Sequence, residues 1–212
     1  MSWYEIYVEE IKLKKDKKKY VNYKIKHKKK LISLITKYSS DKILEAGCGT
    51  GIISTYLASL GYYVKAVDID IDILKLSKEI ADEYSSLNKP IFEKMDIFNL
   101  DVKEEFDVVF SNGVLEHFTD IEIKEIIKRQ LDIAKYVIIG IPTIFFNQDE
   151  ALYGDERFLP LEHWRKLFSE INSKIVDESA YHYMTLIERI RAFKKWSRPL
   201  PFHIFVLANI KM

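Results

Sequence analysis

Short apolar runs alternate along most of the chain with segments of helical periodicity. The apolar runs have the length of strands and occupy residues 43–46, 63–67, 90–95, 106–110 and 136–141. Between them, apolar positions recur three or four residues apart, which is the spacing of one helix face. These helical segments are residues 52–60, 71–84 and 121–134. Strands that alternate with amphipathic helices form parallel sheets covered on both faces, so the pattern predicts a doubly wound α/β fold.

The two ends of the chain depart from this alternation. Residues 3–38 have the pattern of one or two helices, and residues 41–212 contain the remaining elements. We therefore expect an N-terminal helical, lysine-rich extension at residues 1–40 and one domain at 41–212. In the last third of the chain, the pattern predicts a helix at 161–171 and a strand that starts at 174–177. It then predicts a helix at 185–196, a turn at 199–201 and a closing strand at 203–210.

Positive charge is concentrated in one part of the N-terminal extension. Eleven lysines and a single acid, Asp16, lie between Lys12 and Lys30, a local charge of +10 in a chain of net charge +1. One interpretation is a solvated helix surface. The other is a contact for an anionic partner, namely RNA, a phosphorylated substrate or a carrier protein. The tract has no arginine, which argues against sequence-specific binding of nucleic acid.

Cysteine content and apolar runs bear on the compartment. Cys48 is the only cysteine, so no disulfide can form within the chain, as is usual in a reducing compartment. The longest apolar stretch, residues 136–146, is interrupted by Gly140 and Pro142 and is too short to cross a bilayer. The N-terminus lacks the apolar core of a signal peptide. We expect a cytoplasmic protein without membrane contact.

Three glycines mark the turn between the first strand and the following helix. Gly47, Gly49 and Gly51 alternate with other residues, and such glycines let the backbone approach a ligand at the helix N-terminus. Asp68 ends the next strand, where a carboxylate accepts the hydroxyl groups of a ribose or caps the following helix. Position 52 is Ile where a dinucleotide fingerprint has its third glycine. The turn therefore indicates a nucleotide-type ligand without a pyrophosphate.

Four segments in this order resemble the motifs of a known family. They are residues 43–51, 66–69, 94–97 and 106–118. Together they resemble class I S-adenosylmethionine (SAM)-dependent methyltransferases, close to the small-molecule type, over about residues 40–142. The resemblance implies a Rossmann-like seven-stranded sheet, mostly parallel with an antiparallel last strand, and helices on both faces. It also implies SAM as cofactor and S-adenosylhomocysteine (SAH) as product.

The resemblance assigns roles to individual positions. The methionine part of the cofactor would lie against Glu45, Gly47, Cys48 and Gly49, with Asn112 beside it. Asp68 would hold the ribose hydroxyls, Ile69 would pack on the adenine ring, and Asp96 would accept a hydrogen bond from the adenine amino group near the Ile97 backbone. Two alternatives stay open: Ile69 and Ile97 as ordinary core residues, and Asp96 as the cap of a turn.

The reaction asks little of the protein beyond positioning. SAM is already an activated methyl donor, so holding donor and acceptor in line supplies much of the catalysis. A hydroxyl or ammonium acceptor also needs a base, and His117 is the best candidate by its position after the fourth strand. The alternative is that His117 shapes the pocket or caps a helix. Weaker candidates are Tyr153, His163 and His182, and no metal site is expected.

The acceptor itself is not specified by these motifs. Segments 144–160 and 180–201 are expected to select a small-molecule acceptor, because ligands of open α/β sheets bind beyond the strand ends. Whether oxygen, nitrogen or carbon receives the methyl group stays open, as does the oligomeric state. Alternatives are a methyltransferase of RNA or of a carrier-bound substrate, and a catalytically silent cofactor-binding subunit. A nucleotide-dependent oxidoreductase is disfavoured by Ile52.

Overall fold

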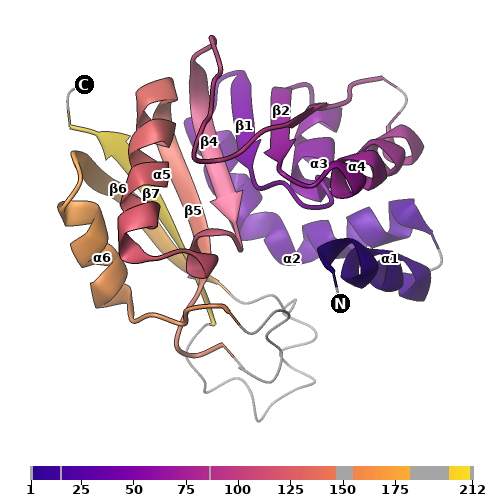
Figure 1. The fold of residues 1–212 in the computed structure, drawn as a ribbon. Helices are drawn as coiled ribbons and strands as arrows, with labels where there is room; N and C mark the ends of the chain where they lie inside the picture. The colour runs from indigo at the N-terminus through magenta and orange to yellow at the C-terminus, as the bar shows by residue number, and fades with distance from the viewer. Residues whose placement is uncertain (1, 15, 86, 147–154, 182–200, 211–212) are drawn as a thin grey trace.

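A seven-stranded sheet forms the centre of the molecule. The computed structural model describes residues 2–14, 16–85, 87–146, 155–181 and 201–210. The strands are β1 (Lys42–Ala46), β2 (Tyr63–Asp68), β3 (Ile91–Lys94), β4 (Phe106–Asn112), β5 (Ala134–Pro142), β6 (Ser173–Tyr181) and β7 (Phe202–Asn209). Their order across the sheet is β3-β2-β1-β4-β5-β7-β6 (Figure 1).

Strand directions agree with the predicted fold. The pairs among β3, β2, β1, β4 and β5 are parallel, whereas β7 runs antiparallel to both β5 and β6. The last strand is therefore antiparallel, and the prediction of a mostly parallel Rossmann-like sheet is confirmed. Chain order reverses between β1 and β4, which is the topological switch point where such sheets bind ligands.

Helices cover both faces of the sheet. They are α1 (Trp3–Lys14), α2 (Lys17–Tyr38), α3 (Ile52–Ser59), α4 (Ile71–Tyr84), α5 (Asp120–Ile133) and α6 (Leu161–Ser169), with a short 3₁₀ helix η1 (Leu115–His117). The predicted helix at 185–196 and most of the predicted turn at 199–201 lie outside the described residues. The helix and strand predictions for the described residues are confirmed, with small shifts at the ends.

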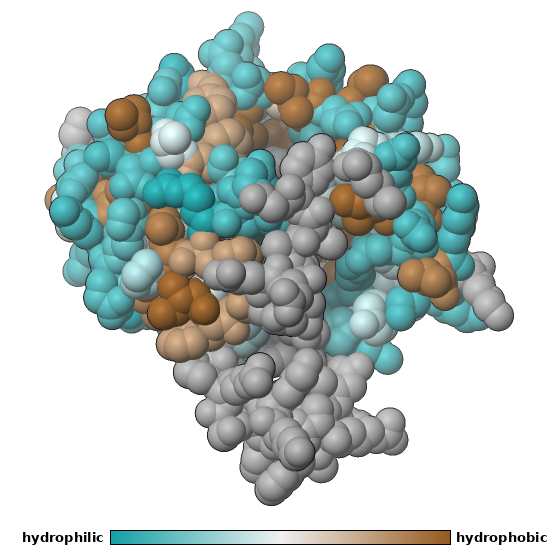
Figure 2. Space-filling view, turned by 60° about the horizontal axis from the view of Figure 1, so that its bottom comes forward, coloured by the Kyte–Doolittle hydropathy of each residue, from teal (hydrophilic) through white to brown (hydrophobic). Residues whose placement is uncertain are grey.

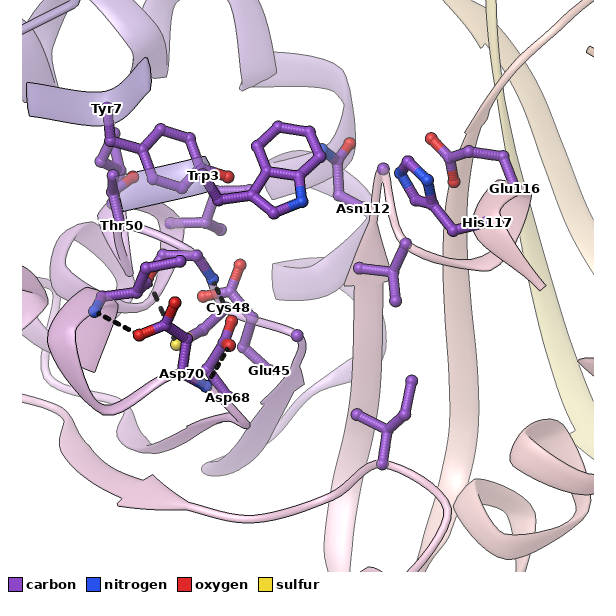
Figure 3. Close-up of a pocket in the computed structure, with 18 of the residues that line it drawn as sticks. Trp3, Tyr7, Glu45, Cys48, Thr50, Asp68, Asp70, Asn112, Glu116 and His117 are labelled. Atoms are coloured by element: carbon purple, nitrogen blue, oxygen red, sulfur yellow. Dashed lines mark hydrogen bonds between the residues drawn. The ribbon is translucent and has the colours of Figure 1, made fainter. Parts of the chain in front are cut away.

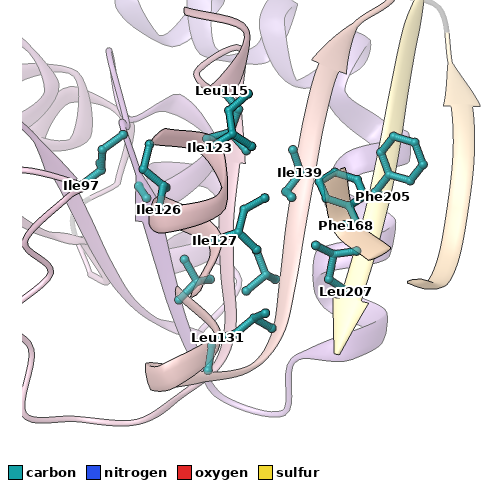
Figure 4. Packing of buried hydrophobic residues seen from close by; sticks show 14 of the residues in the cluster. Ile97, Leu115, Ile123, Ile126, Ile127, Leu131, Ile139, Phe168, Phe205 and Leu207 are labelled. Atoms are coloured by element: carbon teal, nitrogen blue, oxygen red, sulfur yellow. The ribbon is translucent and has the colours of Figure 1, made fainter. Parts of the chain in front are cut away.

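Two apolar clusters hold these layers together. On one face, isoleucines of α5 such as Ile123 and Ile127 pack with Ile139 of β5 and Phe205 of β7 (Figure 4). On the other face, α2, α3 and α4 pack against the sheet, and Ile35 of α2 is fully buried there. The helix that carries most of the lysine tract thus buries one side in the core, which fixes the direction of its remaining side chains.

Asp107 fastens the amino end of β4 to the segment that leads into β1. Its Oδ2 atom accepts hydrogen bonds from the Ser40 hydroxyl (2.7 Å) and from the backbone N–H groups of Ser40, Asp41 and Lys42. Its Oδ1 atom lies 2.7 Å from the Lys135 ammonium group. These donors hold the pKa of Asp107 below its usual range, against the opposing effect of burial.

Figure 2 shows the distribution of hydrophobic and hydrophilic side chains on one face of the molecule. On the face shown in Figure 2, hydrophobic side chains form separate small groups among hydrophilic ones. Of the helices in the described ranges, none combines the length and the apolar content needed to traverse a membrane.

Candidate active site

The glycine turn after β1 is tied directly to the end of β2. The N–H groups of Gly47 and Cys48 both donate to the Val67 carbonyl oxygen at 2.9 Å. Gly47, Gly49 and Gly51 have φ values of 72°, 51° and 61°, in the left-handed region that favours glycine. A Cβ atom at Gly47 would lie 2.8 Å from a methyl carbon of Val114. The turn therefore requires glycine both for its backbone conformation and for close packing.

Asp68 braces this turn from the end of β2. Its Oδ2 atom accepts a hydrogen bond from the Gly49 N–H group at 2.9 Å, and its Oδ1 atom accepts one from Asp70 N–H at 3.1 Å. Burial raises the pKa of Asp68. The N-cap of α4 is Asp70, whose carboxylate accepts from Asp72 N–H, so the interpretation of Asp68 as the helix cap is wrong.

Glu45 is a buried acid beneath the glycine turn. Its Oε2 atom accepts hydrogen bonds from both the hydroxyl and the N–H group of Ser54. Burial raises the pKa of Glu45 to about 8 and also raises the pKa of the Cys48 thiol. Cys48 is therefore a neutral, buried side chain at neutral pH and lacks the thiolate of a nucleophile.

A cavity of about 970 Å³ opens beside these residues. It brings together the nine residues assigned to the cofactor and the base candidate His117, namely Glu45, Gly47, Cys48, Gly49, Asp68, Ile69, Asp96, Ile97, Asn112 and His117. Ile69 is 64% exposed, so the interpretation of this residue as core is wrong, whereas Ile97 does belong to the core cluster. Asp96 caps a turn by accepting from Phe98 N–H at 2.9 Å, and it faces the cavity as well.

Helix α1 forms a wall of the cavity that sequence reasoning missed. The Trp3 ring stacks on the Tyr7 ring with centroids 5.8 Å apart and meets the His117 ring edge-on at 5.9 Å. Figure 3 shows both α1 rings across the cavity from Glu45 and Asp68. Trp3 and Tyr7 are four residues apart and share one helix face. From the sequence, this spacing shows that the two rings lie on the same side of the helix. It does not show which part of the protein that side contacts.

Of the histidine candidates for the base, the structure places one in the cavity and one outside it. His117 lies in the cavity, and its Nδ1 atom is 2.7 Å from Asp155 Oδ1. His163 on α6 instead pairs with Asp120, its Nε2 atom 2.9 Å from Asp120 Oδ2, and it does not line the cavity. Tyr153 and His182 lie outside the described residues.

Aromatic rings line the part of the cavity that lies beyond Asn112. Phe146 and Phe158 stack with centroids 5.4 Å apart, and Phe146 meets Phe202 edge-on at 5.3 Å. Phe146 and Phe158 belong to the segment that the sequence assigned to the substrate, of which residues 147–154 lie outside the described part.

Two charged side chains, Glu116 and Lys28, also face this region. Glu116 is 4% exposed, and burial raises its pKa to about 7. Lys28 of α2 is partly buried, and burial lowers its pKa to about 8. Sequence reasoning counted Lys28 only as one member of the lysine tract, because helix periodicity does not reveal which lysine faces the sheet edge.

Comparison with known proteins agrees with this geometry. Residues 43–135 match the family model of a methyltransferase domain. Residues 43–135, which contain all four motifs, therefore carry the sequence pattern of a methyltransferase domain. The prediction from the four motifs is thereby confirmed, and the family to which the domain belongs uses SAM as its cofactor.

Individual relatives of the methyltransferase domain are distant. The maize phosphoethanolamine N-methyltransferase 1 is 29% identical over 71% of this chain and 31% of that protein. The ubiquinone biosynthesis O-methyltransferase of Rickettsia conorii is 34% identical over 47% of this chain and 35% of that protein. The chain spans about a third of the length of these relatives. Magnesium protoporphyrin IX methyltransferase from Synechocystis, solved with bound SAH, has the same fold, with a TM-score of 0.67 at 15% identity over 91% of this chain and 85% of that one.

Proposed function

We propose that this chain transfers the methyl group of SAM to a small-molecule acceptor. The observation that carries the proposal is the position of the Asp68 carboxylate, which holds the Gly49 N–H group at the rim of the cavity. A carboxylate at the end of the second strand beside a glycine turn is the arrangement that binds a ribose. Asp68 both braces the turn and lines the cavity next to Ile69, an exposed apolar residue.

The residues around the cavity fit the cofactor part by part. Ile69 offers an exposed apolar face for the adenine ring, and Asp96 offers a carboxylate oxygen at the same wall. The cavity volume of about 970 Å³ lies at the upper end of the range of about 300–1,000 Å³ for small-molecule sites, so the cavity is large enough for a ligand of the size of the cofactor. The acidic side chains Glu45 and Asp68 favour a ligand of positive charge, which suits a sulfonium with an ammonium group.

Bound SAM supplies a methyl group activated by the sulfonium. The protein holds the acceptor in line and keeps water out, and the Trp3 and Tyr7 rings together with Phe146 and Phe158 serve the second task. His117 is our candidate for the base that takes the acceptor proton. Asp155 holds its Nδ1 atom, an arrangement that leaves Nε2 as the acceptor of a proton and stabilises the imidazolium.

The acceptor is proposed to be small because aromatic rings and the buried Glu116 line the same cavity as the residues assigned to the cofactor. Some relatives are named for phosphoethanolamine and for ubiquinone biosynthesis, and others for malonyl-[acyl-carrier protein] and for ribosomal protein L11. To test the proposal, SAH formation is measured after SAM and an ultrafiltrate of a cell extract are added to the chain. We expect SAH with the ultrafiltrate. If SAH forms only with the macromolecules that the filter retains, the acceptor would instead be RNA or a carrier-bound substrate.

We also propose that exposed lysines on α2 contact an anionic partner. Lys17 pairs with Glu79 and Glu83, and Lys24 pairs with Glu10, so part of the tract is neutralised within the protein. Lys26, Lys29 and Lys30 are exposed and available to a partner. The chain is mixed with ribosome-free RNA at increasing salt concentrations. RNA binding whose affinity falls steeply with salt would support this contact.

A further inference from the structure

We propose that Glu116 and Lys28 form the acceptor-binding pair, and that the acceptor presents an N–H or O–H group to Glu116 and an anionic group to Lys28. The inference rests on the proposed methyltransferase function and adds the chemical class of the acceptor to it. Both residues line the cavity, and they come from different elements, η1 and α2.

Glu116 carries an unsatisfied acceptor atom. Its Oε2 atom is buried and has no hydrogen-bond partner within the described part of the chain. The backbone at Glu116 is anchored, since the Glu116 carbonyl oxygen accepts from Arg157 N–H at 2.9 Å. A buried carboxylate oxygen without a partner is unfavourable, so a ligand that donates a hydrogen bond to it binds more tightly. An N–H or O–H group of the acceptor supplies that donor.

Two lysines of the tract, Lys24 and Lys28, line the cavity, and Lys24 is paired with Glu10. In the described residues the Lys28 ammonium group has one hydrogen bond, a long one of 3.4 Å to Asn112 Oδ1, and no carboxylate within ion-pair distance. It lies 5.6 Å from the centroid of the Phe202 ring. The remaining N–H donors of a partly buried ammonium group favour an anionic ligand.

We place Lys28 beside the acceptor because of the residues that surround it. Asn112 Oδ1 also accepts from the Tyr181 hydroxyl at 3.1 Å, and Tyr181 stacks on Phe202 with centroids 5.3 Å apart. Tyr181 and Phe202 belong to β6 and β7, on the far side of β5 from the glycine turn. Glu116 and Lys28 thus line one cavity together with the aromatic rings of Phe146, Phe158 and Phe202, which suits an acceptor with two polar ends.

Matched probes test the pair in the SAH-saturated chain by calorimetry. 4-Hydroxybenzoate is compared with phenol, which lacks the anion, and with benzoate, which lacks the donor. Phosphoethanolamine is compared with ethanolamine. We expect at least one two-ended probe to bind about tenfold more tightly than its counterpart without the anion, as one added charge-assisted hydrogen bond provides. Equal affinities within both comparisons would overturn the inference.

Variants assign the effect to each side chain. Lys28→Met removes the advantage of the anionic probe, whereas Lys29→Met, an exposed neighbour on the same helix, keeps it. Glu116→Gln weakens the two-ended probe and leaves benzoate unchanged. An advantage that persists in Lys28→Met contradicts the inference. Weaker SAH binding in Lys28→Met contradicts it as well, because Lys28 then binds the cofactor carboxylate. Wild-type chain that fails to bind SAH contradicts the proposed function itself.

Discussion

The Tyr7 hydroxyl group lies directly over Gly49, so that a Cβ atom added to Gly49 would be 2.8 Å from the Tyr7 oxygen. The N–H group of the same glycine donates to Asp68. The first helix of the chain and the carboxylate of Asp68, which we propose binds the ribose, therefore meet at one residue. This relationship makes α1 a wall of the proposed cofactor site, although the sequence suggested a separate extension.

Loss of the Tyr7 ring should weaken cofactor binding. Tyr7→Ala removes an aromatic wall, and we expect the Kd of SAH to rise about tenfold, while Tyr7→Phe keeps the ring and stays close to wild type. Calorimetry with SAH measures the change. The control is Tyr4→Ala, an exposed ring on the same helix that does not line the cavity. Tyr7→Ala with wild-type affinity would show that α1 does not contact the cofactor.

Glu45 should lose a proton when SAM binds. Burial raises its pKa to about 8, so it is largely protonated at pH 7, and a cationic ligand nearby favours the carboxylate and lowers that pKa. Binding therefore releases protons below pH 8, and SAM affinity rises as the pH increases from about 6 to 8. Calorimetry in buffers of different ionisation enthalpy counts the protons. Glu45→Gln should abolish this part of the release, and an unchanged count in that variant contradicts the prediction.

His117 should matter for the rate more than for cofactor affinity. If it takes the acceptor proton, His117→Asn lowers kcat about 100-fold or more and leaves the Kd of SAH near the wild-type value. Asp155→Asn, which weakens the orientation of the ring, has a smaller effect on kcat. Turnover with the ultrafiltrate and SAH calorimetry provide the two readouts. A His117→Asn variant that loses kcat and SAH affinity to the same degree would indicate that His117 only shapes the pocket.

Asp107 should stabilise the fold in a pH-dependent way. Asp107→Asn removes a charged acceptor of several hydrogen bonds, and we expect the free energy of unfolding at pH 7 to fall by about 1–3 kcal/mol. The pKa of Asp107 is lowered in the folded state, so its stabilisation is complete above the unfolded pKa of about 4 and is lost as the pH falls further.

Urea unfolding at several pH values tests this dependence. The difference between wild type and Asp107→Asn should be constant from about pH 7 to 5 and shrink below about pH 4. Asp101→Asn, at an exposed position without a side-chain hydrogen bond in the described residues, serves as the control. A difference that does not shrink at low pH would mean that the Asp107 charge contributes nothing.

The sequence was most informative where function depends on local spacing. Gly47, Gly49 and Asp68 were found because a strand, a turn and the next strand end must follow one another at set intervals. Trp3 and Lys28 were not found, because their roles depend on how α1 and α2 pack against the edge of the sheet. Glu116 stood within a motif that the sequence did reveal, but its burial and its unpartnered oxygen are properties of the folded chain alone.

Calorimetric titration with SAH tests the central claim most directly. We expect the wild-type chain to bind one SAH and no NAD, and Asp68→Ala to bind SAH about 10- to 100-fold more weakly, because a charged acceptor of the ribose hydroxyls is lost. Asp72→Ala, which removes an exposed carboxylate from the first turn of α4, should match wild type. A wild-type chain that binds neither SAM nor SAH, or an Asp68→Ala variant with unchanged affinity, would contradict the account.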